Sequence, residues 1–339
     1  MPANPPLCYQ CKKRVADTYR PTDGRFLCSK CFSTWVVDTV RRTIKKGKLF
    51  KRDDRIVVGL SGGKDSVVLL DILYQLERDF PSELIAVCID EGIAGYRDDG
   101  LPIARRNAKR LGIEFRLFSF KELFGYTLDE IVARSRELRQ TLPSTRQTKL
   151  IQHAPCSYCG VFRRKALNYA ARVVEGDKVA TGHNLNDVSQ TILLNLLRGD
   201  VARLLQNTLT PTEKAHDLFV PRVKPLQMVA ERSVVLYAFY NQLTYHMTEC
   251  PYAVEAMRLD VRDFLTTIEE KYPGTLGAIR NSIHSLTSQR STADKTPLPF
   301  SKITLCKICS EPSKTVICKG CQMLEALFQK NSLKSDPSP

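Results

Sequence analysis

The segment GLSGGKDSVVLL, residues 59–70, combines residue types that suit the binding of a phosphate group. Its glycines let backbone N–H groups approach an anion closely, and its serines and lysine add hydroxyl and ammonium donors. The apolar run RIVVGL before it predicts a strand, and the apolar pattern after it predicts a helix, whose N-terminus favours an anion. We assign the phosphate contacts to Ser61, Gly62, Gly63, Lys64, Asp65 and Ser66.

This loop is not a Walker loop, because the first glycine of G-x4-G-K-[ST] is missing at its required distance. A strand-to-helix turn that binds no ligand is the alternative interpretation. The strand before the loop and the helix after it are, however, the context that a phosphate loop requires, and they favour the binding site.

Eight of the twelve cysteines fall into two tetrads with the spacing of zinc ribbons. In each tetrad two C-x2-C pairs are separated, by sixteen residues in the first and by eight in the second. The tetrads are Cys8, Cys11, Cys28 and Cys31, and Cys306, Cys309, Cys318 and Cys321. We expect each to bind one structural Zn²⁺, with redox dithiols as the alternative, and a closed site of this kind leaves no open position for catalysis.

Four cysteines remain outside the tetrads. Cys88 lies in the apolar run ELIAVCID, where a buried thiol usually acts as a small hydrophobic side chain. Cys156 and Cys159 form a C-x2-C pair in PCSYCG, and Cys250 lies 91 residues beyond Cys159, so that only the fold can bring it to the pair.

The composition indicates a globular protein with a polyanionic partner. The chain has 339 residues, a net charge of +15 and 43% hydrophobic residues. Nucleic acid fits this charge better than an anionic membrane, because no long basic amphipathic helix is evident. We find neither a signal peptide nor an apolar run of about 18 residues. We therefore expect a soluble intracellular protein, whose cysteines hold metals or do chemistry rather than form disulfides.

Strands and helices alternate through the middle of the chain. The runs RIVVGL, ELIAVCID, IEFRLFSF and DKVATGH predict four strands, with helical patterns between them. Such alternation predicts an α/β fold with a parallel sheet that is covered on both faces. In sheets of this kind ligands bind beyond the carboxyl ends of the strands, where the loop at 61–66 lies.

Around this α/β core we divide the chain into seven segments. They are an N-terminal zinc ribbon (1–32), a basic linker helix (33–54), the nucleotide-binding domain (55–200), a mostly helical continuation with Cys250 (201–285), a linker (286–303), a C-terminal zinc ribbon (304–325) and a tail (326–339). The basic face of the helix at 33–54 either contacts RNA or is simply solvated, and the sequence leaves both open.

The segment SGGKDS after the first strand resembles the signature of the PP-loop ATP pyrophosphatases, a group with an adenine nucleotide alpha hydrolase-like fold. Members activate a carbonyl oxygen by adenylation and release pyrophosphate. The segments PCSYCG, TGHNLND, LLRGD and ECPY between two zinc ribbons are similar to those of cytosolic tRNA 2-thiouridine synthetases. The segment DEGIAGYRDDGL resembles the branch that thiolates the wobble uridine.

This resemblance implies an ATP- and Mg²⁺-dependent tRNA-uridine 2-sulfurtransferase. It implies that Cys156, Cys159 and Cys250 hold a 4Fe–4S cluster whose fourth iron, lacking a protein ligand, can bind sulfide. It assigns catalytic roles to Lys64, Asp65 and Asp187, and a nucleotide contact to Gly182. His183 either contacts the nucleotide as well or is merely a histidine at a strand end. Position 186 is Asn where the family usually has a second acidic residue, and Arg163 stands where some relatives have a lysine.

The resemblance also implies partners: tRNA, a ubiquitin-like sulfur-carrier protein, and a paralogous subunit or a second copy of the chain. It places the protein in the cytoplasm, with no membrane partner. Arg163, Arg164 and Lys165 either meet tRNA phosphates or form a solvated charge run. The alternatives are a three-cysteine zinc site, persulfide chemistry at the cysteine pair, another PP-loop enzyme, and a non-catalytic tRNA-binding scaffold.

Overall fold

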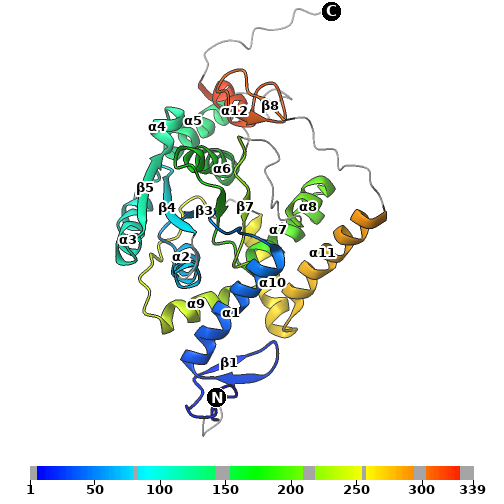
Figure 1. Cartoon of the computed structure of the whole chain (residues 1–339). Coiled ribbons are helices and arrows are strands. Elements are labelled where there is room, and N and C mark those ends of the chain that lie inside the picture. The colour runs from blue at the N-terminus through cyan, green and yellow to red at the C-terminus, as the bar shows by residue number, and fades with distance from the viewer. Residues whose placement is uncertain are drawn as a thin grey trace, which may run out of the picture.

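A five-stranded parallel sheet forms the centre of the protein (Figure 1). The computed structural model describes residues 6–78, 82–141, 153–208, 218–253, 257–293 and 303–328. The strand order is β5–β4–β3–β6–β7. The strands are β3 (Arg55–Gly59), β4 (Glu83–Asp90), β5 (Glu114–Ser119), β6 (Lys178–Ala180) and β7 (Arg222–Val223). The predicted parallel sheet is confirmed, and β7 is an addition that the sequence did not reveal.

Helices cover both faces of the sheet, because successive side chains of a buried strand point to opposite sides. Ile56 and Val58 of β3 belong to one apolar core, and Val57 belongs to the other. The first core includes α1 (Ser29–Gly47), α2 (Lys64–Glu77), α3 (Arg97–Arg110) and α9 (Glu231–Tyr240). The second includes α4 (Phe120–Phe124), α5 (Leu128–Thr141), α6 (Pro155–Val173) and α12 (Lys319–Phe328).

Four further helices pack on one another beside the sheet (Figure 1). They are α7 (Leu185–Leu197), α8 (Val201–Thr208), α10 (Arg258–Lys271) and α11 (Thr275–Ala293). Helix α11 extends into the range 286–303 that we expected to be a linker, so the first part of that range is helical. The Ser and Thr residues that suggested a linker lower helix propensity only slightly, and residues 294–302 lie outside the described part.

The two cysteine-rich knobs lie at opposite ends of the molecule (Figure 1). The N-terminal knob contains the antiparallel pair β1 (Thr18–Arg20) and β2 (Arg25–Leu27), and the C-terminal knob contains β8 (Thr304–Leu305) and β9 (Pro312–Ser313). Both knobs end in a helix that enters the core: α1 begins inside the predicted ribbon, and α12 continues past its predicted end. Residues 329–339 of the predicted tail are outside the described part.

The sheet topology fixes where the functional loops meet. β3 lies between β4 and β6, and the chain leaves β3 for one neighbour and reaches the other only later. The carboxyl ends of β3 and β6 therefore form a topological switch point, where open α/β sheets bind ligands. No helix in the described ranges is long and apolar enough to span a membrane.

Candidate nucleotide and cysteine site

The loop between β3 and α2 is held in shape by its own serines. The backbone N–H of Ser61 donates to Ser66 Oγ at 3.1 Å, and Ser66 Oγ donates to the Gly63 carbonyl at 2.9 Å. Gly63 is the N-cap of α2 and supplies no capping side chain. Since the first N–H groups of a helix have no partner within the helix, those of α2 are available to an anion such as a phosphate.

Two glycines allow other segments to approach this loop. Gly62 has a φ of +87°, and a Cβ atom there would lie 2.3 Å from the carbonyl oxygen of Gly100 at the start of α3. A Cβ atom on Gly182, after β6, would lie 2.8 Å from the carbonyl carbon of Asp65. The loop is therefore enclosed by backbone on both sides, which leaves no room for a side chain at either glycine.

Lys64 lies between two carboxylates. Its Nζ atom is 2.9 Å from Asp65 and 2.7 Å from Glu231 at the start of α9. Burial alone would lower the pKa of Lys64, but the two acidic side chains outweigh it and raise the pKa. Lys64 is therefore held as a positive charge beside the phosphate loop. Its predicted contact with phosphate stays a prediction, and Glu231 was not anticipated.

The turn after β6 brings Asp187 to the loop. Asn184 caps α7 and forms a reciprocal capping box with Asp187. Its Nδ2 atom also donates to Asp65 at 2.8 Å, so one asparagine joins both predicted catalytic carboxylates. Burial raises the pKa of Asp187, and Arg258 opposes this shift from 3.5 Å. Mg²⁺ is usually held by one or two carboxylates together with substrate phosphates, which this pair can supply.

The neighbouring positions 183 and 186 are placed differently. Asn186 Oδ1 accepts from the backbone N–H of Glu231 at 2.9 Å and thus stabilises the start of α9. The Asn186 side chain therefore has a structural role in this chain, and it supplies no carboxylate for a metal ion. His183 is exposed, and its Nδ1 atom lies 2.8 Å from Thr181 Oγ1. Its predicted nucleotide contact stays a prediction.

Cys156, Cys159 and Cys250, which belong to neither tetrad, come together at the N-terminal end of α6. Cys156 Sγ lies 3.5 Å from the carbonyl of Tyr252, two residues beyond Cys250. Cys159 and Cys250 pack against the same apolar core, and Cys159 interacts electrostatically with both other thiols. Burial raises the pKa of Cys159 to about 11, and Arg163 opposes this shift.

Arg163 and Lys165, two of the basic residues after Cys159, form polar contacts with other side chains of the protein. Arg163 donates to Cys159 Sγ at 3.0 Å and pairs with Glu91 at 2.7 Å. Burial opposes the charge of Arg163, but Glu91 outweighs it and raises the pKa, so this guanidinium does not release a proton. Lys165 donates to Cys309 Sγ at 3.0 Å, whereas the paired Arg163 side chain is 48% exposed, so tRNA contact and solvation of this basic run both stay predictions.

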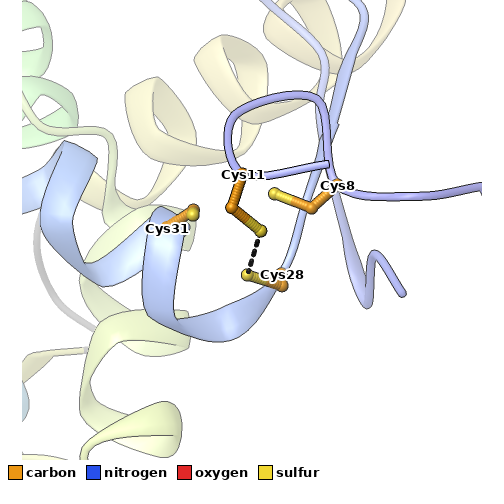
Figure 2. A group of neighbouring side chains, drawn as sticks. All are labelled: Cys8, Cys11, Cys28 and Cys31. Carbon is orange, nitrogen blue, oxygen red and sulfur yellow. Dashed lines mark hydrogen bonds between the residues drawn. The ribbon is translucent and has the colours of Figure 1, made fainter. Parts of the chain in front are cut away.

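The two tetrads have the geometry of metal sites. Among the described residues, only they bring three or more candidate ligand atoms within 4.8 Å of one another. Figure 2 shows the N-terminal tetrad, with Cys31 on α1. The Cys11 and Cys28 sulfurs are 4.0 Å apart. The Cys309 and Cys318 sulfurs are 3.8 Å apart. Tetrahedral zinc with bonds of about 2.3 Å requires a sulfur separation of about 3.8 Å, so both sites fit such an ion.

Cys88 takes no part in these sites. Its side chain is 1% exposed and lies in the core between the sheet and α2. Burial raises the pKa of its thiol to about 12, which makes a reactive thiolate unfavourable. The prediction of a small hydrophobic side chain is confirmed.

The structure adds residues that the sequence did not single out. The backbone N–H of His246 donates to the Gly62 carbonyl at 3.1 Å. Burial lowers the pKa of its imidazole, and neither ring nitrogen has a hydrogen-bond partner within the described ranges. Arg97 donates to the Ser61 carbonyl at 3.2 Å and pairs with Glu91. These residues are remote from the loop in sequence, and only the quoted segment DEGIAGYRDDGL gave any signal for Glu91 and Arg97.

A phosphate loop at the switch point of a parallel sheet, next to a cysteine site, defines a PP-loop nucleotide-binding protein, and a family model described as a PP-loop domain matches residues 36–153. Cytoplasmic tRNA 2-thiolation protein 1 of Chlamydomonas reinhardtii is 38% identical over 95% of this chain and 85% of its own length. The proteins of that name from Danio rerio and Saccharomyces cerevisiae are 37% and 38% identical, and their alignments span 89% and 86% of their own lengths. The chain belongs to the cytoplasmic tRNA 2-thiolation protein 1 family.

A solved structure resembles nearly the whole fold. It is that of the U34-tRNA thiolase NcsA from Methanococcus maripaludis with its [4Fe-4S] cluster. The two structures align with a TM-score of 0.76 and 32% sequence identity over 99% of this chain and 100% of the other. The match therefore spans the terminal knobs of this chain as well as its PP-loop core.

Proposed function

We propose that this protein is an ATP-dependent tRNA-uridine 2-sulfurtransferase that acts at the wobble position. The carrying observation is that the phosphate loop and Cys159 are joined by direct side-chain contacts through Arg97, Glu91 and Arg163. This chain of contacts supports an adenylating site and a sulfur-binding site within one active site. The names of the relatives and of the solved thiolase point to the same activity and to the cytoplasm.

The loop residues would act in the first half of the reaction. Ser61, Ser66 and the N–H groups that open α2 bind the ATP phosphates, while Lys64 neutralises their charge. Asp65 and Asp187 hold Mg²⁺ against the phosphates. The C2 oxygen of uridine attacks the α-phosphorus and pyrophosphate leaves, which converts that oxygen into a good leaving group. A sulfide then forms the bond to C2, and the oxygen departs with AMP.

We assign the sulfur to a 4Fe–4S cluster held by Cys156, Cys159 and Cys250. When bound, such a cluster supplies an iron without a protein ligand, to which sulfide can attach. Three thiolates on one zinc ion would need sulfur separations of about 3.8 Å. These three cysteines are not among the groups of ligand atoms within 4.8 Å in the described residues, which favours ligands on three separate irons.

The remaining assignments concern metals and partners. We assign one Zn²⁺ to each closed tetrad, where it stabilises a knob. A ubiquitin-like carrier with a C-terminal thiocarboxylate would deliver the sulfur, and a paralogous subunit or a second copy of the chain would complete the assembly. These partners rest on the family resemblance.

The tRNA would bind to the basic face of α1. Phe32, Val36 and Val40 bury the apolar face of this helix, while Arg41 and Arg42 are exposed. The two arginines border a groove of about 410 Å³ beside the N-terminal knob, which is also lined by Trp35 and Arg20. Cationic side chains beside an aromatic ring suit the phosphates and unstacked bases of RNA.

The test is an anaerobic assay with tRNA, ATP and sulfide. The wild-type protein should form AMP, pyrophosphate and 2-thiouridine. Asp65→Ala and Ser61→Ala should abolish AMP formation while tRNA binding persists, because the loop does not carry the tRNA. Thiolated cytidine would indicate another PP-loop thiolase. Binding of tRNA without AMP formation by the wild-type protein would indicate a non-catalytic scaffold.

A further inference from the structure

Glu91 is a fully buried carboxylate that joins two arginines. It follows β4, while Arg97 opens α3 and Arg163 lies on α6 (Figure 1). One carboxylate oxygen pairs with Arg97, and the other lies 2.7 Å from Arg163. The Glu91 side chain is 0% exposed and that of Arg97 is 5% exposed. Burial alone would raise the pKa of Glu91, but Arg163 and Arg97 lower it, so this carboxylate is ionised.

Such a triad is poorly explained by fold stability. Removing charges from water is costly, and replacing a buried ion pair such as Glu91–Arg97 by apolar residues of similar volume is often neutral or stabilising. The backbone of Glu91 already holds its own position, since its carbonyl accepts from the N–H of Leu128 at 2.7 Å. The function of the Glu91 side chain therefore depends on what Arg97 and Arg163 contact besides Glu91.

Each arginine ends on a different half of the proposed active site. Arg97 Nη1 donates to the Ser61 carbonyl at 3.2 Å. Because a trans peptide is planar with its C=O and N–H on opposite sides, this contact also fixes the direction of the Gly62 N–H. At the other end, Arg163 Nη2 donates to Cys159 Sγ at 3.0 Å. The triad thus orients a peptide of the phosphate loop and a sulfur ligand together.

We propose that Glu91 is a positioning residue that couples the phosphate loop to Cys159 by holding Arg97 and Arg163 in one rigid unit. This inference rests on the proposed function, because the coupling matters only if the nucleotide and sulfur sites act on one substrate. This rigid unit would hold the incoming sulfur at the position from which it can attack the activated C2 carbon. It also adds one net positive charge where a sulfur anion and a departing AMP must be close together.

The first test measures ATP affinity by calorimetry on the iron-free full-length protein. Arg163→Gln, whose side chain is 48% exposed, should change ATP affinity by about 5-fold or more, at the low end of typical couplings between sites. In the Glu91→Gln background the same change should have no further effect. Equal effects in both backgrounds, or none in either, would overturn the proposal.

The second test compares turnover. Glu91→Gln should lower kcat about 10²-fold, as expected for a misplacement of about 1 Å, with little change in KM for tRNA. Asp71→Asn is the matched control, because Asp71 is also buried and pairs with Arg110 at 2.8 Å, but on the opposite side of the sheet from α6. It should keep the wild-type kcat. Equal losses of kcat in both variants would reduce Glu91 to a structural role.

Both tests separate the inference from the proposed function. If the wild-type protein forms 2-thiouridine while Glu91→Gln does the same at full rate, only the inference fails. If the wild-type protein neither binds ATP nor thiolates tRNA, the proposed function fails and the inference fails with it. Should Glu91→Gln not fold, Glu91→Asp keeps the charge but shortens its reach to the two arginines, and it should show the same loss of kcat.

Discussion

Gly62→Ala should disable the phosphate loop while the fold survives. The new Cβ atom would lie 2.3 Å from the Gly100 carbonyl oxygen. Carbon–oxygen contacts of this kind are normally about 3.3 Å or longer, so the loop and the start of α3 must separate by about 1 Å. A displacement of about 1 Å at a catalytic site costs about 10²-fold in rate. We expect AMP formation to fall about 10²-fold, with a loss of about 1–3 kcal/mol in unfolding free energy from the strained φ of +87°.

Gly112→Ala is the matched control for this prediction. Gly112 also has a positive φ of +67°, but a Cβ atom there meets nothing within 4 Å. It follows α3 at the end remote from the loop. Chemical denaturation should show a loss of stability in both variants, larger for Gly62→Ala because of the added contact with Gly100, and an assay of AMP release should show a loss only for Gly62→Ala. Near-normal AMP release by Gly62→Ala would refute the tight enclosure of the loop.

Two further predictions concern metals and tRNA. Protein prepared without oxygen should contain two zinc ions and about four irons per chain. Cys250→Ala should keep both zinc ions but lose the iron absorbance and thiolation. Cys88→Ala should cause only a modest loss of packing. Three zinc ions and no iron in the wild-type protein would contradict the cluster. The logarithm of tRNA affinity should fall steeply with the logarithm of salt concentration, and Arg41→Ala should reduce that slope by about one. An unchanged slope would remove α1 from the tRNA-binding surface.

Strands β3 and β4 were predictable because each is a nearly continuous apolar run, as strands buried on both faces are. β7 escaped prediction because it contributes only Arg222 and Val223, too few for any periodicity to show. The end of α11 was also missed, because its Ser- and Thr-rich last turns read as a linker. For β7, pairing with β6 decided the conformation rather than local propensity.

The candidate site also contains residues that the sequence predicted and residues that it did not. The phosphate loop and the two tetrads were visible because their residues lie close together at diagnostic spacings. Glu231 and His246 reach the loop from more than 160 residues away, and no local pattern marks them. The partners of Arg163 and Lys165 were equally hidden, since a run of basic residues gives no sign of the buried groups that it meets.

The most direct test of the account follows the uridine C2 oxygen. A tRNA substrate labelled with ¹⁸O at this atom would be incubated without oxygen with the protein, ATP and sulfide, and the AMP analysed by mass spectrometry. Adenylation of the C2 oxygen predicts that each AMP formed with 2-thiouridine carries one ¹⁸O atom, because the C2–O bond breaks when sulfur arrives. Unlabelled AMP alongside thiolated product would show that ATP is hydrolysed by water, and it would contradict the proposed role of the phosphate loop.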